Sequence, residues 1–144
     1  MATVEYLLLA NHAEVRGGLL YVSGAGWANL FRGSRNPDDP IPLSHFGIGA
    51  GFLIPYDETN QLHHIVARIA KEDGDEELTR IQGNMEVGRP TGLAQGAEQH
   101  IVVGLSVDVQ FPEEGTYRVV MQIGNDERSV VFRVLDQDRP LHLS

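Results

Sequence analysis

The C-terminal part of the chain, residues 111–134, carries the pattern that most constrains the fold. Apolar and polar residues alternate there in two runs that flank a polar turn at residues 124–126. One face of the first run holds Tyr117, Val119, Met121 and Ile123, and a matching face of the second holds Val130, Phe132 and Val134. A period of two is typical of strands buried on one face, so the segment predicts an antiparallel hairpin.

Comparable short runs recur along the rest of the chain, separated by turn-forming residues. They predict strands at residues 4–10, 19–23, 27–31, 45–54, 62–71, 79–87 and 99–109, with a short helical turn or loop at 11–18 and a possible bulge at Gly83. No segment has a helical period. The expected fold class is all-β, an antiparallel β-sandwich of immunoglobulin-like or related type with about 8–9 strands.

The segment Pro112 to Tyr117 adds a second indication of a sandwich. It is similar to the strand entry of immunoglobulin-like domains, where a tyrosine hydroxyl bonds back to the backbone at a corner of the sandwich. The chain has 144 residues and no linker, which predicts a single domain over residues 1–135. The polar residues 136–144 predict a flexible C-terminal tail.

The composition excludes several classes of partner and chemistry. The chain has 20 acidic and 11 basic residues, a net charge of -9 and a single lysine, Lys71, so binding to a nucleic-acid backbone is not expected. The absence of cysteine excludes disulfides, thiolate metal sites and thiol catalysis. No apolar run approaches the ~20 residues of a membrane helix, so no membrane partner and a cytoplasmic location are expected.

Several segments together resemble a known family. They are residues 5–10, 18–27, 54–60 with His63, 72–74, 88–93 and 115–117. In these segments the chain resembles an uncharacterised family of small bacterial, chiefly actinobacterial, single-domain β proteins of unknown function. The resemblance covers nearly the whole chain and implies one compact β domain, but it supplies no catalytic residue. The chain departs from the family at Gly47, Gly49 and Gly51, where members have larger residues.

Histidines are the only nitrogen ligands available for a metal. His63 and His64 are neighbours in a predicted strand and therefore point to opposite faces. His45, His100 and one of that pair lie on three different predicted strands, and the sequence leaves open whether they cluster. No two of them have the spacing of a known metal site. Surface histidines are the preferred interpretation, and no metal or cofactor is expected.

Other catalytic arrangements have even less support. The carboxylates of Asp57, Glu58, Glu86 and Asp108 could do acid and base chemistry, but the sequence does not show an opposed pair in a cleft. No serine lies in a nucleophile-elbow sequence, and no glycine-rich segment has the lysine of a phosphate-binding loop. We therefore assign no catalytic residue and regard a hydrolase as the least favoured function.

A stripe of glycines on one predicted strand is the strongest indication of a binding surface. Gly47, Gly49 and Gly51 share the face opposite the apolar residues of segment 45–54. Such a face is nearly flat and lets another sheet, a loop or a partner chain approach closely. The alternative is that the loop at 32–43 folds over it. The neighbouring strand 62–71 is apolar on both faces, which predicts a covering loop or an oligomer interface.

These features favour a non-enzymatic binding or assembly module. The expected surface is the glycine-rich face edged by the loops at 32–43 and 88–97, and the expected partner is a protein or a second copy. Arg32, Arg35 and Arg89 are predicted polar anchors, because guanidinium groups suit interfaces.

The alternative is a module that binds a small ligand or carbohydrate. Trp27, the only tryptophan, and Tyr56 would then form aromatic platforms. A tryptophan after a glycine turn more often covers one end of the core, and that is the preferred interpretation of Trp27.

Overall fold

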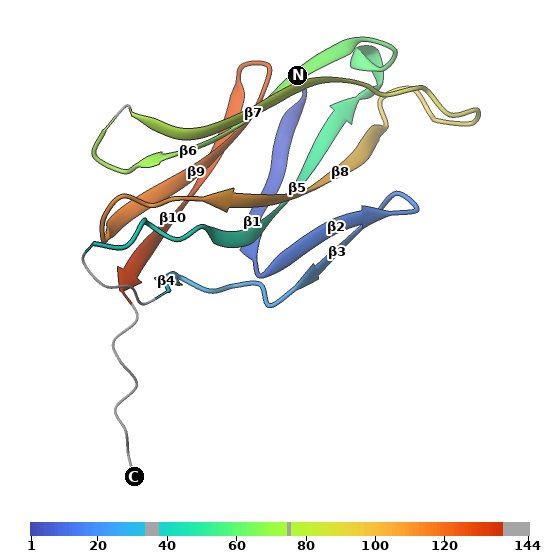
Figure 1. Cartoon of the computed structure of the whole chain (residues 1–144). Coiled ribbons are helices and arrows are strands. Elements are labelled where there is room, and N and C mark those ends of the chain that lie inside the picture. Colours follow the sequence, from blue (N-terminus) through green and yellow to red (C-terminus); the bar gives the residue numbers. More distant parts are fainter. Residues whose placement is uncertain (34–37, 75, 137–144) are drawn as a thin grey trace.

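The structure is a computed structural model that describes residues 1–33, 38–74 and 76–136, and it confirms the all-β fold (Figure 1). The strands are β1 (Thr3–Ala10), β2 (His12–Arg16), β3 (Leu19–Ser23), β4 (Asn29–Arg32), β5 (Ser44–Pro55), β6 (Leu62–Lys71), β7 (Glu77–Glu86), β8 (Glu98–Val109), β9 (Gly115–Ile123) and β10 (Asp126–Asp136). A 3₁₀ turn, η1 (Tyr56–Glu58), follows β5. The predicted tail, apart from Asp136 at the end of β10, lies outside the described residues. No helix among these residues is long and apolar enough to span a membrane.

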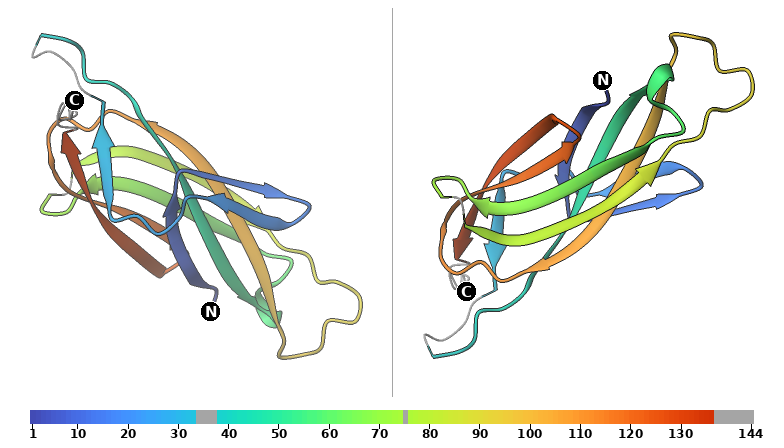
Figure 2. Two further views of the ribbon diagram at one scale, coloured as in Figure 1. Left: turned by 90° about the horizontal axis from the view of Figure 1, so that it is seen from below. Right: turned by 90° about the horizontal axis from the view of Figure 1, so that it is seen from above.

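Two sheets face each other to form the sandwich (Figures 1 and 2). One has the strand order β1-β5-β8 and the other β4-β10-β9-β6-β7, while β2 and β3 form a separate two-stranded ribbon. In the described part of the chain, all strand pairs are antiparallel except β4 with β10, which run parallel from Asn29 beside Arg133 onward. The prediction of antiparallel pairing is therefore wrong at this one edge. β4 reaches the sheet through a long connection and not through a hairpin, so it can run parallel to β10.

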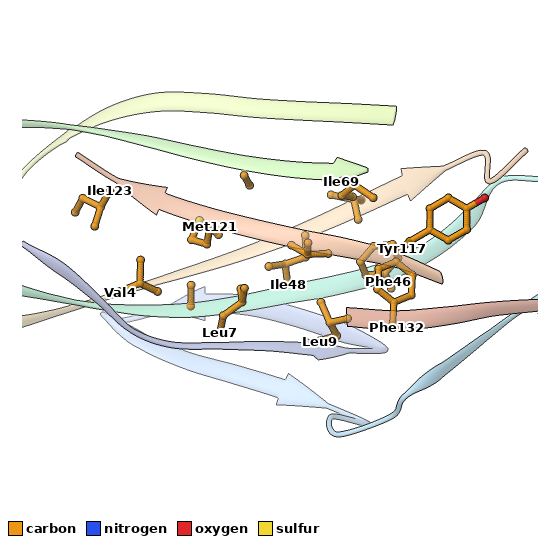
Figure 3. Packing of buried hydrophobic residues seen from close by; sticks show 14 of the residues in the cluster. Val4, Leu7, Leu9, Phe46, Ile48, Ile69, Tyr117, Met121, Ile123 and Phe132 are labelled. Atoms are coloured by element: carbon orange, nitrogen blue, oxygen red, sulfur yellow. The ribbon is translucent and has the colours of Figure 1, made fainter. Parts of the chain in front are cut away.

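The core lies between the two main sheets, as the period-two pattern predicts (Figure 3). Phe46, Ile48 and Phe52 of β5 face Tyr117 and Met121 of β9, and all five side chains are fully buried. Each such burial contributes roughly 1.5–3 kcal/mol. The predicted C-terminal hairpin is confirmed as β9 and β10, with Tyr117 opposite Phe132.

The expected tyrosine corner is also present. The Tyr117 hydroxyl donates a hydrogen bond of 2.7 Å to the carbonyl oxygen of Glu113. Burial of the ring raises the pKa of this phenol above its ordinary value. The bond satisfies the one polar atom of a side chain that is otherwise packed in the core.

The prediction of a helical turn or loop at 11–18 was wrong, because residues 12–16 form β2. Gly17 and Gly18 make a two-residue turn in which both φ angles are positive, at 58° and 76°. A turn of this kind matches the twist of antiparallel strands and favours a hairpin. The β2–β3 hairpin packs on the outer face of the β1-β5-β8 sheet and adds a third layer (Figure 1).

Candidate functional site

The glycine stripe of β5 is not an open surface, because the β2–β3 hairpin covers it. A Cβ atom added at Gly47 would lie 2.5 Å from the backbone nitrogen of Ala13, and one at Gly104 of β8 would lie 3.0 Å from the backbone of Glu14. At Gly49 the nearest atoms belong to side chains, including that of Leu20, at 3.1 Å. The predicted close approach of another sheet does occur, but the approaching element belongs to the same chain.

Gly51 is covered in a different way. The ring of Tyr6, from β1, occupies the space where a Cβ atom of Gly51 would be. Burial, with a smaller effect of the Glu5 carboxylate, raises the pKa of the Tyr6 phenol. None of the three atoms nearest to an added Cβ at Gly47, Gly49 or Gly51 belongs to the described residues 38–43. The prediction of an open surface is therefore wrong, because the hairpin and Tyr6 fill this face, and the nearest atoms do not come from the described residues of the 32–43 loop.

Arg32 is a structural residue and not a free anchor. Its side chain is only 7 % exposed, and its Nη1 donates to the carbonyl oxygen of Phe111 at 2.9 Å. Its Nε donates to the Asp136 carboxylate at 2.7 Å, which ties β4 to the end of β10. A buried guanidinium is stable only when it is paired in this way. Arg35, the second predicted anchor, lies outside the described residues.

Arg89 and Tyr56 form one local unit at the far end of β5. The Arg89 guanidinium stacks on the Tyr56 ring, with its carbon 3.9 Å from the ring centroid. It also donates to the Tyr56 carbonyl and the Thr59 hydroxyl, both at 2.8 Å. Tyr56 lines an open hollow of about 330 Å³ with Asp57 and Glu98. Arg89 therefore fixes the η1 turn, and one face of the Tyr56 ring is already occupied.

Trp27 covers one end of the core, which confirms the preferred prediction for this residue. Its ring meets those of Phe46 and Phe132 edge-on, at centroid distances of 5.9 and 6.0 Å. Trp27 packs at the start of β5 and Tyr56 follows its end, so the two do not share one site. The indole Nε1 is buried and has no hydrogen-bond partner among the described residues. Another part of Trp27 lines an open hollow of about 410 Å³ together with Asn11 and Phe31.

The histidines whose clustering was left open do not form one group. The ring nitrogens bond to separate partners: His45 to Asp108, His63 to the Glu58 carbonyl, His64 to Asn84 and His100 to Glu5. In the part of the chain that the structure describes, no three histidine or carboxylate side chains are placed to hold a metal ion.

The open side of the sandwich, between β7 and β8, is the surface that the sequence did not predict. An apolar hollow of about 220 Å³ lies there, which we call the slot. It is lined by Ile65 and Ala67 of β6, residues 81–85 of β7, and Val103 and Leu105 of β8. Ile65 and Ala67 belong to the strand whose two apolar faces predicted a covering element. Both side chains form the floor of the slot, and the oligomer interface predicted at this strand stays a prediction.

Gly83 distinguishes the slot from the covered face. It is opposite Ile65 in a regular part of the β6–β7 register, so the predicted bulge at this position is wrong. Its φ angle is not positive, and a Cβ atom added there would have nothing within 4 Å. Neither backbone conformation nor packing within the described chain requires glycine here. A strand glycine of this kind is typical of a place where a ligand or another backbone approaches closely.

Both strands that border the slot are at sheet edges. β7 pairs only with β6 and β8 only with β5 among the described residues. Residues 81–85 of β7 contain neither charge nor proline, the devices that usually protect an exposed edge. One signal of this site is visible in the sequence, the glycine inside an alternating run, but no local pattern shows that β7 is an edge strand.

The family comparison agrees with the resemblance noted above. Residues 5–134 match the model of a family of unknown function, DUF6941. The chain belongs to this family. No curated protein and no solved structure gives a significant match. The match spans nearly the whole sandwich and is consistent with a single-domain family, but it assigns no activity to any residue.

Proposed function

We propose that this protein is a non-enzymatic binding or assembly module that contacts another protein through the slot and the free edge of β7. The observation that carries this proposal is the combination of an apolar slot with an unprotected strand edge. Ile81, at the rim, is 37 % exposed, and Gly83 leaves space beside it. A partner strand added to β7 would gain backbone hydrogen bonds at the edge and apolar contacts in the slot.

Photo-crosslinking from β7 tests this proposal. A benzoylphenylalanine at Gln82, which is exposed beside the slot, is expected to crosslink to one protein of defined mass in cells that produce the full chain. The same group at Ser129, exposed on β10, serves as the control position. Adding Gly83→Glu should abolish the crosslink, because it places a charge at the apolar slot, at a position where the Cβ atom itself meets nothing within 4 Å.

Gly33→Glu is the matched control variant. Gly33 also lacks a positive φ angle, and among the described residues an added Cβ would meet only Pro42, at 4.0 Å. This variant should leave the crosslink unchanged. Equal crosslinking from both positions, or no protein adduct at Gln82, would contradict the proposed function.

A second proposal concerns small ligands, and it rests on Trp27. Trp27 lines an open hollow, where its ring offers a platform for a polar ligand such as a sugar, and its buried indole N–H has no acceptor among the described residues. Because Trp27 is the only tryptophan, its fluorescence reports on this hollow alone. Titration with a panel of mono- and disaccharides should shift the emission. Unchanged emission across the panel would contradict a sugar site here.

Two further features belong to the proposal. A cytoplasmic location is supported by a sequence without cysteine, which suits a reducing compartment. A relationship to immunoglobulin-like sandwiches is supported by the hydrogen bond from the Tyr117 hydroxyl to the Glu113 carbonyl.

A further inference from the structure

We propose that the occupant of the β7 edge is a second copy of this chain, paired antiparallel through β7 about a two-fold axis at Gly83. This inference rests on the proposed function and names its partner. Three properties of β7 support it: a free edge, a sequence that is complementary to itself in one register, and open space at Gly83.

Of the two free edges that border the slot, that of β7 is the more accessible. β8 is also unpaired on one side, but the β2–β3 hairpin crosses it and the hairpin tip reaches past it (Figure 2, left). The backbone of Glu14 lies directly over Gly104 at this crossing. An overhanging element of this kind obstructs strand addition. Most residues of β7 are exposed, and no described element crosses its free side.

The sequence of β7 favours one register for pairing with a second copy of itself. A two-fold axis perpendicular to the sheet places residues of the same face opposite each other, so the strands can shift only in steps of two residues. With the axis at Gly83, Arg80 of each copy is opposite Glu86 of the other. Of the registers centred on residues 81–85, this is the only one with that match. It gives two symmetry-related pairs of opposite charge across the interface.

Glu86 supports this register because its carboxylate has no charged partner in the described part of the chain. It is exposed, and no ion pair joins it to another residue in the described part of the chain. Arg80 bonds to Glu77 on its own strand at 2.8 Å, but its side chain is 46 % exposed and free to reach a second carboxylate. Both residues lie on the outer face, away from the slot, so their pairing does not require burial of a charge.

The residues of β7 that face the slot also fit each other in this register. In the same register Ile81 of one copy is opposite Met85 of the other, and both line the slot. Gly83 meets Gly83 at the axis, where any larger side chain would directly face its own copy. Opposed Cβ positions lie about 4.5–5.5 Å apart, so the glycine pair leaves room into which Ile81 and Met85 can pack. The two slots would then join under a continuous sheet and close the open side of each sandwich.

The mass in solution tests this inference directly. Light scattering of the full chain over a dilution series is expected to show a dimer that dissociates on dilution. Gly83→Glu should give a monomer with unchanged secondary structure by circular dichroism, while Gly33→Glu should remain dimeric. A monomer at every concentration of the unmodified chain would overturn the inference.

A charge reversal tests the register without altering the slot. Arg80→Glu brings like charges together twice in each dimer, so the dissociation constant should rise by about tenfold. The double variant Arg80→Glu/Glu86→Arg restores opposite charges and should recover most of the affinity. A dimer indifferent to Gly83→Glu, or one in which the double variant is weaker than Arg80→Glu alone, would overturn this arrangement.

The crosslinking experiment separates the two conclusions. A monomer that still crosslinks from Gln82 to a different protein would overturn the self-pairing and leave the proposed function standing. A monomer without any crosslink would overturn both.

Discussion

The two apolar surfaces of this sandwich that contain strand glycines differ in what lies over them. On β5, Gly47 is covered by the backbone of the β2–β3 hairpin at a distance that admits no side chain. On β7, Gly83 has open space around it. The same residue type therefore has two physical meanings. Gly47 is required by contacts within the chain, while an added Cβ at Gly83 would meet no atom of the described chain within 4 Å.

The largest expected effect comes from filling the covered face. Gly47→Ala places a methyl group 2.5 Å from the Ala13 backbone nitrogen, so either the hairpin or β5 must move. We expect a loss of about 3 kcal/mol in the free energy of unfolding, measured with urea. Gly49→Ala is the control, because its contacts at 3.1 Å are with flexible side-chain ends. A loss at Gly49 equal to that at Gly47 would contradict backbone contact as the cause.

The second effect concerns the hairpin that covers this face. Leu20, half-buried over Gly49, anchors β3 to the sheet. Leu20→Ala should cost roughly 1–2 kcal/mol, less than a fully buried leucine, because its side chain is partly exposed already. Hydrogen exchange should accelerate at the amides of β2 and β3 and remain slow in β9. Uniform acceleration in all strands would show that the hairpin is not a separable layer.

The third effect has the opposite sign and distinguishes the slot from the covered face. Gly83→Ala adds a methyl group in open space and restricts the unfolded chain, so it should stabilise the fold by about 0.5–1 kcal/mol. Urea unfolding at the lowest concentration of the dilution series measures this without a contribution from self-association. Destabilisation would reveal a contact at Gly83 within the chain and remove the contrast with Gly47.

The smallest effect lies away from both faces, at the ion pair between Lys71 and Glu113. The hydrogen bond from Lys71, aided by its charge, holds the pKa of the Glu113 carboxyl below its ordinary value of 4.5. A lowered pKa contributes stability above the ordinary value, which is lost as the pH falls through the folded-state value.

Glu113→Gln should therefore make the free energy of unfolding slightly less dependent on pH in the acid range. Urea unfolding at a series of pH values below neutral measures this, with Lys71→Met as a second way to remove the pair. The change should be small because the pair is solvent-exposed. A change in the free energy of unfolding as large as that of Gly47→Ala would mean that surface charge contributes as much to stability as packing on the covered face.

Local patterns predicted most of the fold, and the misses have specific causes. The alternation around Tyr117 and Phe132 identified the C-terminal hairpin, because period-two patterns report which face of a strand is buried. The segment 11–18 was missed because its alternation is short, although the Gly17-Gly18 pair was a turn signal for a hairpin. The parallel pairing of β4 with β10 left no local mark, since it joins residues far apart in the chain.

The candidate site was less predictable than the fold. The glycine stripe was correctly recognised as a place of close approach, but the approaching element was unknown without the topology. Arg32 and Arg89 have the guanidinium chemistry of interface anchors, but both bond to atoms of their own chain. Residue type shows what a side chain can bind, while its available partners depend on the position of every other strand.

The sequence by itself determined that this protein is a small all-β domain without disulfides, because alternation and composition are local properties of the chain. It also marked Gly83 as unusual in an alternating run. Only the tertiary structure decided which face of the glycine-rich strand is covered and which strands are left at the edges. Those outcomes depend on long-range pairing, in which β7 is last in its sheet and β2–β3 folds over β5. Self-complementarity in β7 was present in the sequence, but it gained a physical meaning only once β7 was known to have a free edge.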